Sequence, residues 1–156
     1  MAHTPVSSDL ADMYQEVIID HGRHPHNFRR LENATRTAEG VNPLCGDELT
    51  VYLVLADGRI TDIAFQGSGC AISQASASLM TKALTGKTEE DALALFGDVH
   101  SLLTEGSDGD VDLARLGSLA ALSGVSQFPM RVKCATLAWH ALRSALEIDG
   151  ARITRE

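Results

Sequence analysis

Three cysteines could do chemistry in this chain, and each stands at a predicted turn or close to a predicted helix start: Cys45, Cys70 and Cys134. At such positions a thiol meets backbone N–H groups and the positive end of a helix dipole, which favour the thiolate. Thiolates bind metals and act as nucleophiles. An odd number of cysteines cannot all pair within one chain, so metal binding or thiol chemistry is favoured over three unrelated buried thiols.

Asp47 adds a carboxylate to this set. The first cysteine lies in the segment 42–47, Asn-Pro-Leu-Cys-Gly-Asp, in which Pro and Gly predict a loop. The Cys-x-Asp spacing lets both side chains point at one ion, and a compact α+β domain could bring the other two cysteines to the same place. Three sulfurs and one carboxylate fill a tetrahedral zinc shell, and they can equally hold a small iron–sulfur cluster. We therefore predict one metal site with the metal left open, and its four ligands are Cys45, Asp47, Cys70 and Cys134.

The predicted shell has two features beyond its ligands. A carboxylate is a harder ligand than a thiolate, and Asp47 lies in a predicted loop, so we expect a shell that can open. Arg131 and Lys133 stand just before Cys134, near a site whose ligands carry more negative charge than one divalent ion neutralises. Coulomb attraction at short range favours a charge-balancing role for both, and the alternative is two ordinary charges at a helix start.

Two strands joined by a tight turn are the clearest predicted elements. Residues 49–55 and 60–65 are rich in β-branched and apolar side chains, and Asp-Gly at 57–58 supplies the positive φ angles that a hairpin turn demands. Residues 36–41 are a weaker strand prediction. Residues 9–21 carry apolar side chains at helical spacing, which predicts an amphipathic helix before the strands.

Helices are predicted after the strands. A Gly-Ser-Gly segment ends the hairpin, and apolar spacing then predicts a helix that ends at Gly86, so Cys70 lies at a strand-to-helix turn. Short helical pieces are predicted through residue 103 and again from about 112 to 122. The last helix begins near Pro129, and Cys134 falls in its first turns.

Other residues with reactive or aromatic side chains are predicted to be structural. Trp139 lies in the buried stripe of the last helix, and we expect a core residue and not a stacking platform. His21, His24 and His26 stand among Arg and Pro residues. That setting predicts a basic surface segment and disfavours metal ligation.

The composition is typical of a single globular domain. The chain has 156 residues, of which 44% are hydrophobic and 22% charged, so we expect one domain over residues 1–156. The net charge of −8 makes nucleic acid an unfavourable ligand, because phosphate binding needs a surplus of Lys and Arg. Residues 89–112 hold eight acidic side chains and no Lys or Arg, which predicts a surface insertion, with an acidic docking patch as the alternative.

The N-terminal residues lack the basic start and the apolar stretch of a secretory signal, and no apolar run nears membrane-spanning length. We therefore expect a soluble, cytoplasmic protein with neither nucleic acid nor a membrane as a partner. A reducing compartment also disfavours disulfides.

Three segments together resemble the IscU/NifU-type iron–sulfur scaffold family: Cys-Gly-Asp at 45–47, Gly-Ser-Gly-Cys at 67–70 and Lys-Cys-Ala-Thr-Leu-Ala-Trp at 133–139. The similarity extends from the first helix to the last and is closest to the SufU branch. Lys133 precedes the last cysteine, where IscU-type scaffolds carry His. The segment that ends at Arg131 lacks the Leu-Pro-Pro-Val-Lys sequence that their chaperone recognises, and the acidic stretch, about 87–112, occupies the place of a SufU-type insertion.

The resemblance implies an α+β fold with a three-stranded antiparallel sheet packed against helices, which agrees with the predicted elements. SufU-like proteins are zinc-bound sulfur acceptors for a SufS-type cysteine desulfurase, so the implied metal is Zn²⁺ and its implied ligands are Cys45, Asp47, Cys70 and Cys134. Cys45 is implied as the catalytic sulfur acceptor. Its predicted loop agrees with this role, because a mobile cysteine can cross the gap between two proteins while the other two stay anchored on helices.

The leading hypothesis is therefore a sulfurtransferase-like protein that accepts persulfide sulfur from the desulfurase and serves downstream iron–sulfur assembly proteins. Its first rival is a scaffold on which a [2Fe–2S] cluster is built and passed on, which needs the same four ligands with iron or the cluster in place of zinc. A second rival is a purely structural zinc domain that serves as an adaptor. Sequence spacing does not separate the three.

Overall fold

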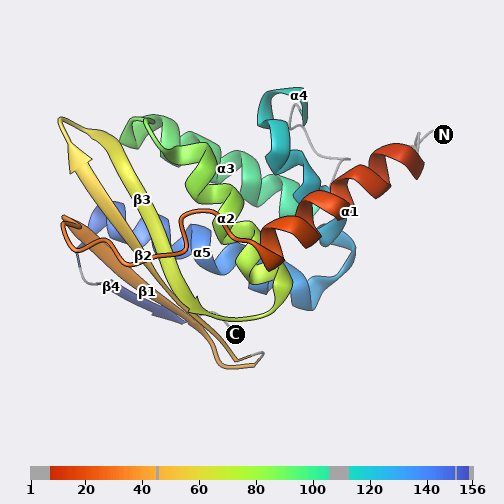
Figure 1. Cartoon of the computed structure of the whole chain (residues 1–156), viewed down its shortest axis with the longest axis horizontal. Coiled ribbons are helices and arrows are strands. Elements are labelled where there is room, and N and C mark those ends of the chain that lie inside the picture. The colour runs from red at the N-terminus through yellow and green to blue at the C-terminus, as the bar shows by residue number, and fades with distance from the viewer. Residues whose placement is uncertain (1–7, 45, 106–112, 150, 155–156) are drawn as a thin grey trace.

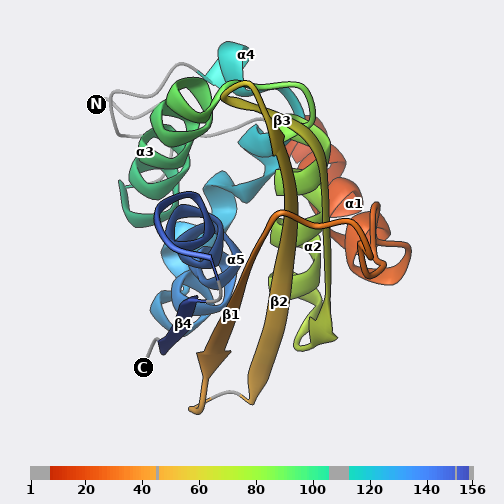
Figure 2. The same cartoon turned by 90° about the vertical axis from the view of Figure 1, so that its left-hand side faces the viewer.

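The structure, a computed structural model, describes residues 8–44, 46–105, 113–149 and 151–154. A twisted sheet lies on one side of the molecule, and helices lie against it (Figures 1 and 2). The strands are β1 (Arg36–Asn42), β2 (Asp47–Ala56), β3 (Arg59–Ser68) and β4 (Ala151–Thr154). The helices are α1 (Ser8–Arg23), α2 (Ala71–Leu84), α3 (Glu89–Glu105), α4 (Leu113–Leu116), the 3₁₀ helix η2 (Gly117–Gln127) and α5 (Pro129–Glu147). None of the helices in these described ranges is long and apolar enough to cross a membrane.

Three antiparallel strands form the sheet, and a fourth strand extends it. The strand order is β3-β2-β1-β4, with β2 antiparallel to both of its neighbours and β4 parallel to β1. The predicted α+β fold with its antiparallel sheet is therefore confirmed. The four-residue β4 was not predicted, because so short a segment does not show a clear alternation of apolar and polar side chains.

The turn between β2 and β3 has the predicted hairpin geometry. Asp57 has a φ of 54° and Gly58 a φ of 75°, the two positive angles that a two-residue hairpin turn needs. The pair Ala56 and Arg59 closes the hairpin, and a register shift follows one step further, between Val54 and Leu55. The hairpin is therefore set by local sequence at this end.

The core lies between the sheet and the helices α2 and α5. Leu49, Val51 and Leu53 alternate along β2 and are buried, as expected for the covered face of a sheet. Trp139 on α5 is 1% exposed and is among the largest fully buried side chains. Its predicted place in the core is confirmed.

The acidic stretch begins as one long helix. Because α3 is a single helix of 17 residues, the prediction of short helical pieces was wrong there. Thr88 caps the helix, since its Oγ1 accepts a hydrogen bond from the N–H of Asp91 at 3.1 Å. The buried residues of α3 are Ala92, Val99, Leu102 and Leu103. This apolar face holds the helix together over its whole length, and residues 106–112 lie outside the described part of the chain.

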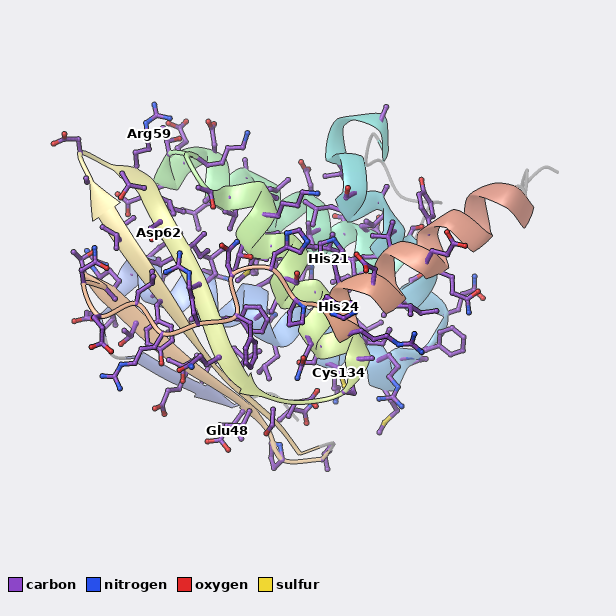
Figure 3. All side chains as sticks on the ribbon, viewed as in Figure 1. His21, His24, Glu48, Arg59, Asp62 and Cys134 are labelled. Atoms are coloured by element: carbon purple, nitrogen blue, oxygen red, sulfur yellow. The ribbon has the colours of Figure 1, made fainter. Side chains whose placement is uncertain are left out.

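His21 departs from the predicted surface segment. It lies in the last turn of α1, is 5% exposed, and its Nδ1 is 2.7 Å from the Oγ of Ser78 on α2 (Figure 3). His24 and His26 are exposed, as predicted. The difference comes from close helix packing, because a Cβ at Gly22 would lie 3.1 Å from a backbone oxygen of α2. The close approach of α1 to α2 buries the His21 ring, although its neighbours in sequence are charged.

Candidate metal centre

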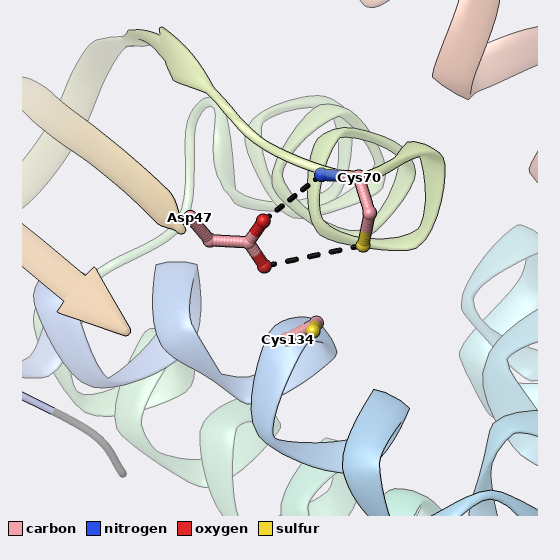
Figure 4. A group of neighbouring side chains, drawn as sticks. All are labelled: Asp47, Cys70 and Cys134. Atoms are coloured by element: carbon pink, nitrogen blue, oxygen red, sulfur yellow. Dashed lines mark hydrogen bonds between the residues drawn. The ribbon is translucent and has the colours of Figure 1, made fainter. Parts of the chain in front are cut away.

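Three of the four predicted ligands meet at one end of the sheet. Asp47 is the first residue of β2, Cys70 directly precedes α2, and Cys134 lies near the start of α5. One donor atom from each side chain lies within 4.8 Å of the other two (Figure 4). The structure therefore brings these side chains to one place, and ligation of a metal by them stays a prediction.

The carboxylate of Asp47 is buried and held by the backbone. Its Oδ1 accepts a hydrogen bond from the N–H of Cys70 at 2.9 Å, and its Oδ2 lies 3.9 Å from the Sγ of Cys70. Gly69 makes this approach possible, because a Cβ there would lie 2.8 Å from Oδ1 of Asp47. One carboxylate oxygen is thus fixed by the turn, and the other faces the sulfur.

The end of β3, just before Cys70, needs a second glycine. Gly67 has a φ of 150°, and a Cβ at this position would collide with the backbone oxygen of Glu48 on β2. Sequence reasoning assigned the Gly-Ser-Gly segment only the ending of a strand. Its position directly before a candidate ligand was the feature that could have indicated a role in positioning Cys70 and Asp47.

The two described sulfurs are held in different ways. Cys70 is the N-cap of α2, and its Sγ accepts a hydrogen bond from the N–H of Ser73 at 3.4 Å. This N–H and the positive end of the α2 dipole stabilise negative charge on the sulfur. Cys134 is 1% exposed, and its Sγ lies 3.6 Å from the backbone oxygen of Met130. Cys70 is therefore the more accessible of the two.

Arg131 faces both sulfurs from the first turn of α5. The negative charge of Cys70, together with hydrogen bonds to Cys134 and Cys70, raises the pKa of Arg131 above its ordinary value. Arg131 is exposed, and because a guanidinium is always charged, it places a positive charge at the rim of the site. Lys133 is also exposed and directly precedes Cys134. The placement agrees with a charge-balancing role, more directly for Arg131 than for Lys133.

Cys45, the fourth predicted ligand, lies outside the described residues. The residues on both sides of it are described: the N–H of Leu44 donates to Oδ1 of Asn42 at 3.1 Å, and Gly46 has a φ of 73°. Only Gly46 separates Cys45 from Asp47 in sequence. Its part in the site stays a prediction from the sequence.

The described donors fit a zinc ion. Thiolates select zinc or iron–sulfur clusters over magnesium and calcium. With Zn–S bonds of about 2.3 Å and Zn–O bonds of about 2.0–2.2 Å, neighbouring donors in a tetrahedral shell lie roughly 3.6–3.8 Å apart. The 3.9 Å between Sγ of Cys70 and Oδ2 of Asp47 is close to this separation. A third sulfur from Cys45 would complete four-coordination.

An open cavity of about 430 Å³ borders the site. Arg131 forms part of its wall, and most of the remaining wall is apolar, including Ile18, Ile72 and Phe128. Phe128 is 60% exposed. The surface beside Arg131 is therefore apolar as well as accessible.

The chain is similar to known proteins over most of its length. The family model described as the NifU-like N-terminal domain matches residues 13–147. The iron–sulfur cluster assembly scaffold protein IscU of Streptococcus pyogenes serotype M1 is 41% identical over 140 residues, which cover 90% of this chain and 86% of that protein. The zinc-dependent sulfurtransferase SufU of Bacillus subtilis (strain 168) is 40% identical over 140 residues, which cover 90% of this chain and 93% of that protein. A crystal structure from Fervidobacterium islandicum AW-1, described as an iron–sulfur cluster assembly scaffold protein for the SUF system, superposes with a TM-score of 0.79 at 36% identity and covers 90% of this chain and 99% of that chain.

Proposed function

This chain belongs to the family of NifU-like N-terminal domains, and on that premise we propose that it is a zinc-dependent sulfur acceptor that takes persulfide sulfur from a SufS-type cysteine desulfurase. The family places the chain among the scaffold proteins of iron–sulfur cluster assembly, and sulfur transfer is the finer step proposed. The observation that carries the proposal is the convergence of Asp47, Cys70 and Cys134 within 4.8 Å.

The residue before the last cysteine favours sulfur transfer over cluster building. Overall identity does not decide, because the IscU and SufU relatives are 41% and 40% identical. IscU-type scaffolds resemble this chain but carry His before the last cysteine, and a neutral imidazole is a metal ligand. Lys133 is a cation at this position and donates no lone pair. The chain therefore lacks this imidazole ligand and relies on its thiolates and Asp47, and this departure from the scaffold pattern supports the sulfur-acceptor proposal.

The chain's own residues would prepare the thiolates for transfer. Cys45, Asp47, Cys70 and Cys134 would hold zinc, which when bound keeps the thiols deprotonated until a partner arrives. The N–H of Cys70 holds Asp47 in place through Oδ1. Arg131 offsets negative charge at the sulfurs, so a thiolate released from the shell stays stabilised at the rim.

The proposed transfer is an exchange between a thiolate and a persulfide. The Cys45 thiolate attacks the outer sulfur of the desulfurase's cysteine persulfide, and a new S–S bond forms between them. The S–S bond of the donor persulfide breaks, and the desulfurase cysteine leaves as a thiolate. The outer sulfur keeps its proton as it passes to Cys45, which becomes the persulfide. The exchange therefore needs no oxidant or reductant.

Cys45 is assigned the acceptor role because the other two sulfurs are anchored. Cys70 caps α2 and Cys134 lies within α5, so moving either would disturb a helix. Cys45 belongs to a Pro- and Gly-containing segment next to Leu44, which is 64% exposed. The largely apolar cavity that includes Arg131 would offer the desulfurase a surface to bind.

Replacing Cys45 by Ala tests the acceptor role. With a purified SufS-type desulfurase and radiolabelled cysteine, we expect the variant to lose both stimulation of desulfuration and sulfur labelling of this chain. Asp62→Ala is the control, because Asp62 lies on β3 in an exposed pair with Arg29 and outside the site. Full stimulation and labelling of the Cys45 variant would refute the assignment.

Metal content separates the proposal from its rivals. Colourless protein with about one zinc per chain agrees with sulfur transfer. Brown protein with labile iron and sulfide would instead show a [2Fe–2S] scaffold. If metal removal unfolds the chain and no thiol accepts sulfur, the site is structural.

A further inference from the structure

A chain of buried hydrogen bonds links the two helices that carry the described sulfurs. The indole Nε1–H of Trp139 on α5 donates to the Oγ of Ser76 on α2 at 3.1 Å. The hydroxyl of Ser76 donates in turn to the backbone oxygen of Ala135 on α5 at 2.6 Å. Ser76 and Ala135 are 0% exposed and Trp139 is 1% exposed, so water does not compete for these bonds.

The link lies close to both sulfurs. Ala135 directly follows Cys134, and Ser76 stands six residues after Cys70. At 1.5 Å per residue, Ser76 is roughly 9 Å along the helix from the sulfur that caps it. If α2 shifted against α5 at Ser76, Cys70 would therefore move relative to Cys134 by nearly the same distance.

Apolar packing and hydrogen bonds constrain the two helices to different degrees. Buried alanines lie next to or close to the linked residues on both helices: Ala75 and Ala77 on α2, and Ala138 on α5. Apolar contact is non-directional, and small side chains leave shallow ridges that allow several packings. A hydrogen bond is confined to a narrow range of distance and angle. The two bonds at Ser76 therefore constrain the position of α2 along and around α5 more narrowly than apolar contact does.

We propose that Ser76, held by Trp139 and Ala135, is a positioning residue that sets the separation of Cys70 and Cys134 for metal binding. The proposal rests on the zinc site proposed above and adds a residue that is not one of the four proposed ligands. It also gives the buried indole of Trp139 a polar role beyond filling the core.

Helix α2 supplies a matched control for the test. Ser78 is also a 0% exposed serine of α2, but its Oγ contacts Nδ1 of His21 and accepts from the N–H of His26, both at 2.7 Å. Ser76→Ala and Ser78→Ala therefore remove the same atom from the same helix. One substitution cuts the link to α5, and the other cuts the link to the segment that begins with α1.

The readouts are zinc affinity, measured by competition with a chromogenic chelator, and the absorption spectrum of the Co²⁺-substituted protein. Ser76→Ala is expected to lower zinc affinity about tenfold or more, the usual effect of losing a residue that orients metal ligands, and to alter the Co²⁺–thiolate bands. Ser78→Ala is expected to keep the wild-type affinity and spectrum. Unfolding of the metal-free proteins shows whether both variants lose similar stability.

Trp139→Phe serves as a second variant, because it removes the N–H donor, with part of the ring volume, and keeps an aromatic ring in the core. It is expected to lower affinity less than Ser76→Ala, since the bond to Ala135 remains. Wild-type affinity and spectrum in both Ser76→Ala and Trp139→Phe would overturn the inference, as would an equal loss in Ser78→Ala. A wild-type protein that binds no zinc would contradict the proposed function and this inference together.

Discussion

Helix α2 bears two polar clusters, and they differ in where their donor atoms point. At its N-terminal end, Asp47, Cys70 and Cys134 turn donor atoms toward one another from three separate elements. Along its middle, Ser78 accepts from the N–H of His26 and contacts His21, and the two imidazole rings stack with centroids 4.6 Å apart. Within the described ranges, the first cluster is the single group of three or more His, Cys, Asp or Glu side chains that converges in this way.

The comparison shows that residue type alone does not make a metal site. Histidine is the commonest protein ligand for metals, yet the ring of His21 contacts Ser78 and packs α1 against α2. Cysteine and aspartate form the candidate centre because glycines let β2, β3 and α2 approach closely at one point. The following experiments test the roles of the two clusters independently, beginning with the largest expected effect.

Cys70→Ser should show the largest difference in zinc affinity between the two clusters. Serine preserves the N-cap of α2, so the helix start should survive, while one sulfur donor is lost. Replacing a residue that hydrogen-bonds to a metal ligand typically lowers metal affinity about 10–100-fold, so loss of a ligand itself should lower zinc affinity at least about 100-fold. The matched change in the other cluster, His21→Gln, should leave zinc affinity unchanged. Equal affinities for Cys70→Ser and the wild type, by chelator competition, would contradict this account.

Gly69→Ala tests whether the turn positions the carboxylate. The added Cβ would lie 2.8 Å from Oδ1 of Asp47, so the carboxylate has to move and its bond to the N–H of Cys70 weakens. We expect zinc affinity to fall about tenfold. Gly97→Ala on α3 is the control, since nothing lies within 4 Å of its added Cβ. Wild-type zinc binding by the Gly69 variant would show that Asp47 is not held in this way.

The smallest expected effect is a pH dependence of stability from the His21 cluster. Burial, with the positive charges of His26 and Lys82, lowers the pKa of His21 below its ordinary value, and Asp20 opposes this. Protonation then favours the unfolded chain, so the contribution is full above about pH 6.5 and is lost as the pH falls toward the lower folded-state pKa.

This pH effect is measured as a difference between two proteins. Denaturant unfolding of the wild type and His21→Gln, above and below about pH 6.5, should show a stability gap that narrows in acid. Zinc-free protein is used, so that competition between protons and zinc for the ligands does not contribute. A gap that widens in acid would mean that the imidazole is stabilised in its charged form.

Most of the elements could be predicted because their determinants are local. The Asp-Gly pair sets the hairpin, the Gly-Ser-Gly segment ends β3, and Pro129 marks the first turn of α5. The approach of Asp47 to Cys70 was predicted as a consequence of ligand chemistry. The residues that secure it, Gly67 and Gly69, were not, because close backbone approach depends on which strands pair.

The remaining features depend on helix packing that sequence spacing does not contain. The burial of His21 follows from the close approach of α1 to α2 at Gly22. The bonds of Ser76 to Trp139 and Ala135 require a particular position of α2 against α5. A serine in an alanine-rich helix gives no indication of such a partner until the two helices are placed.

X-ray absorption at the zinc edge of the purified protein tests the central claim most directly, because it counts sulfur and oxygen neighbours of the metal. This account predicts one zinc bound by three sulfurs and one oxygen, and one sulfur fewer in Cys45→Ala. A shell of nitrogen and oxygen alone, or protein that retains no zinc, would contradict it.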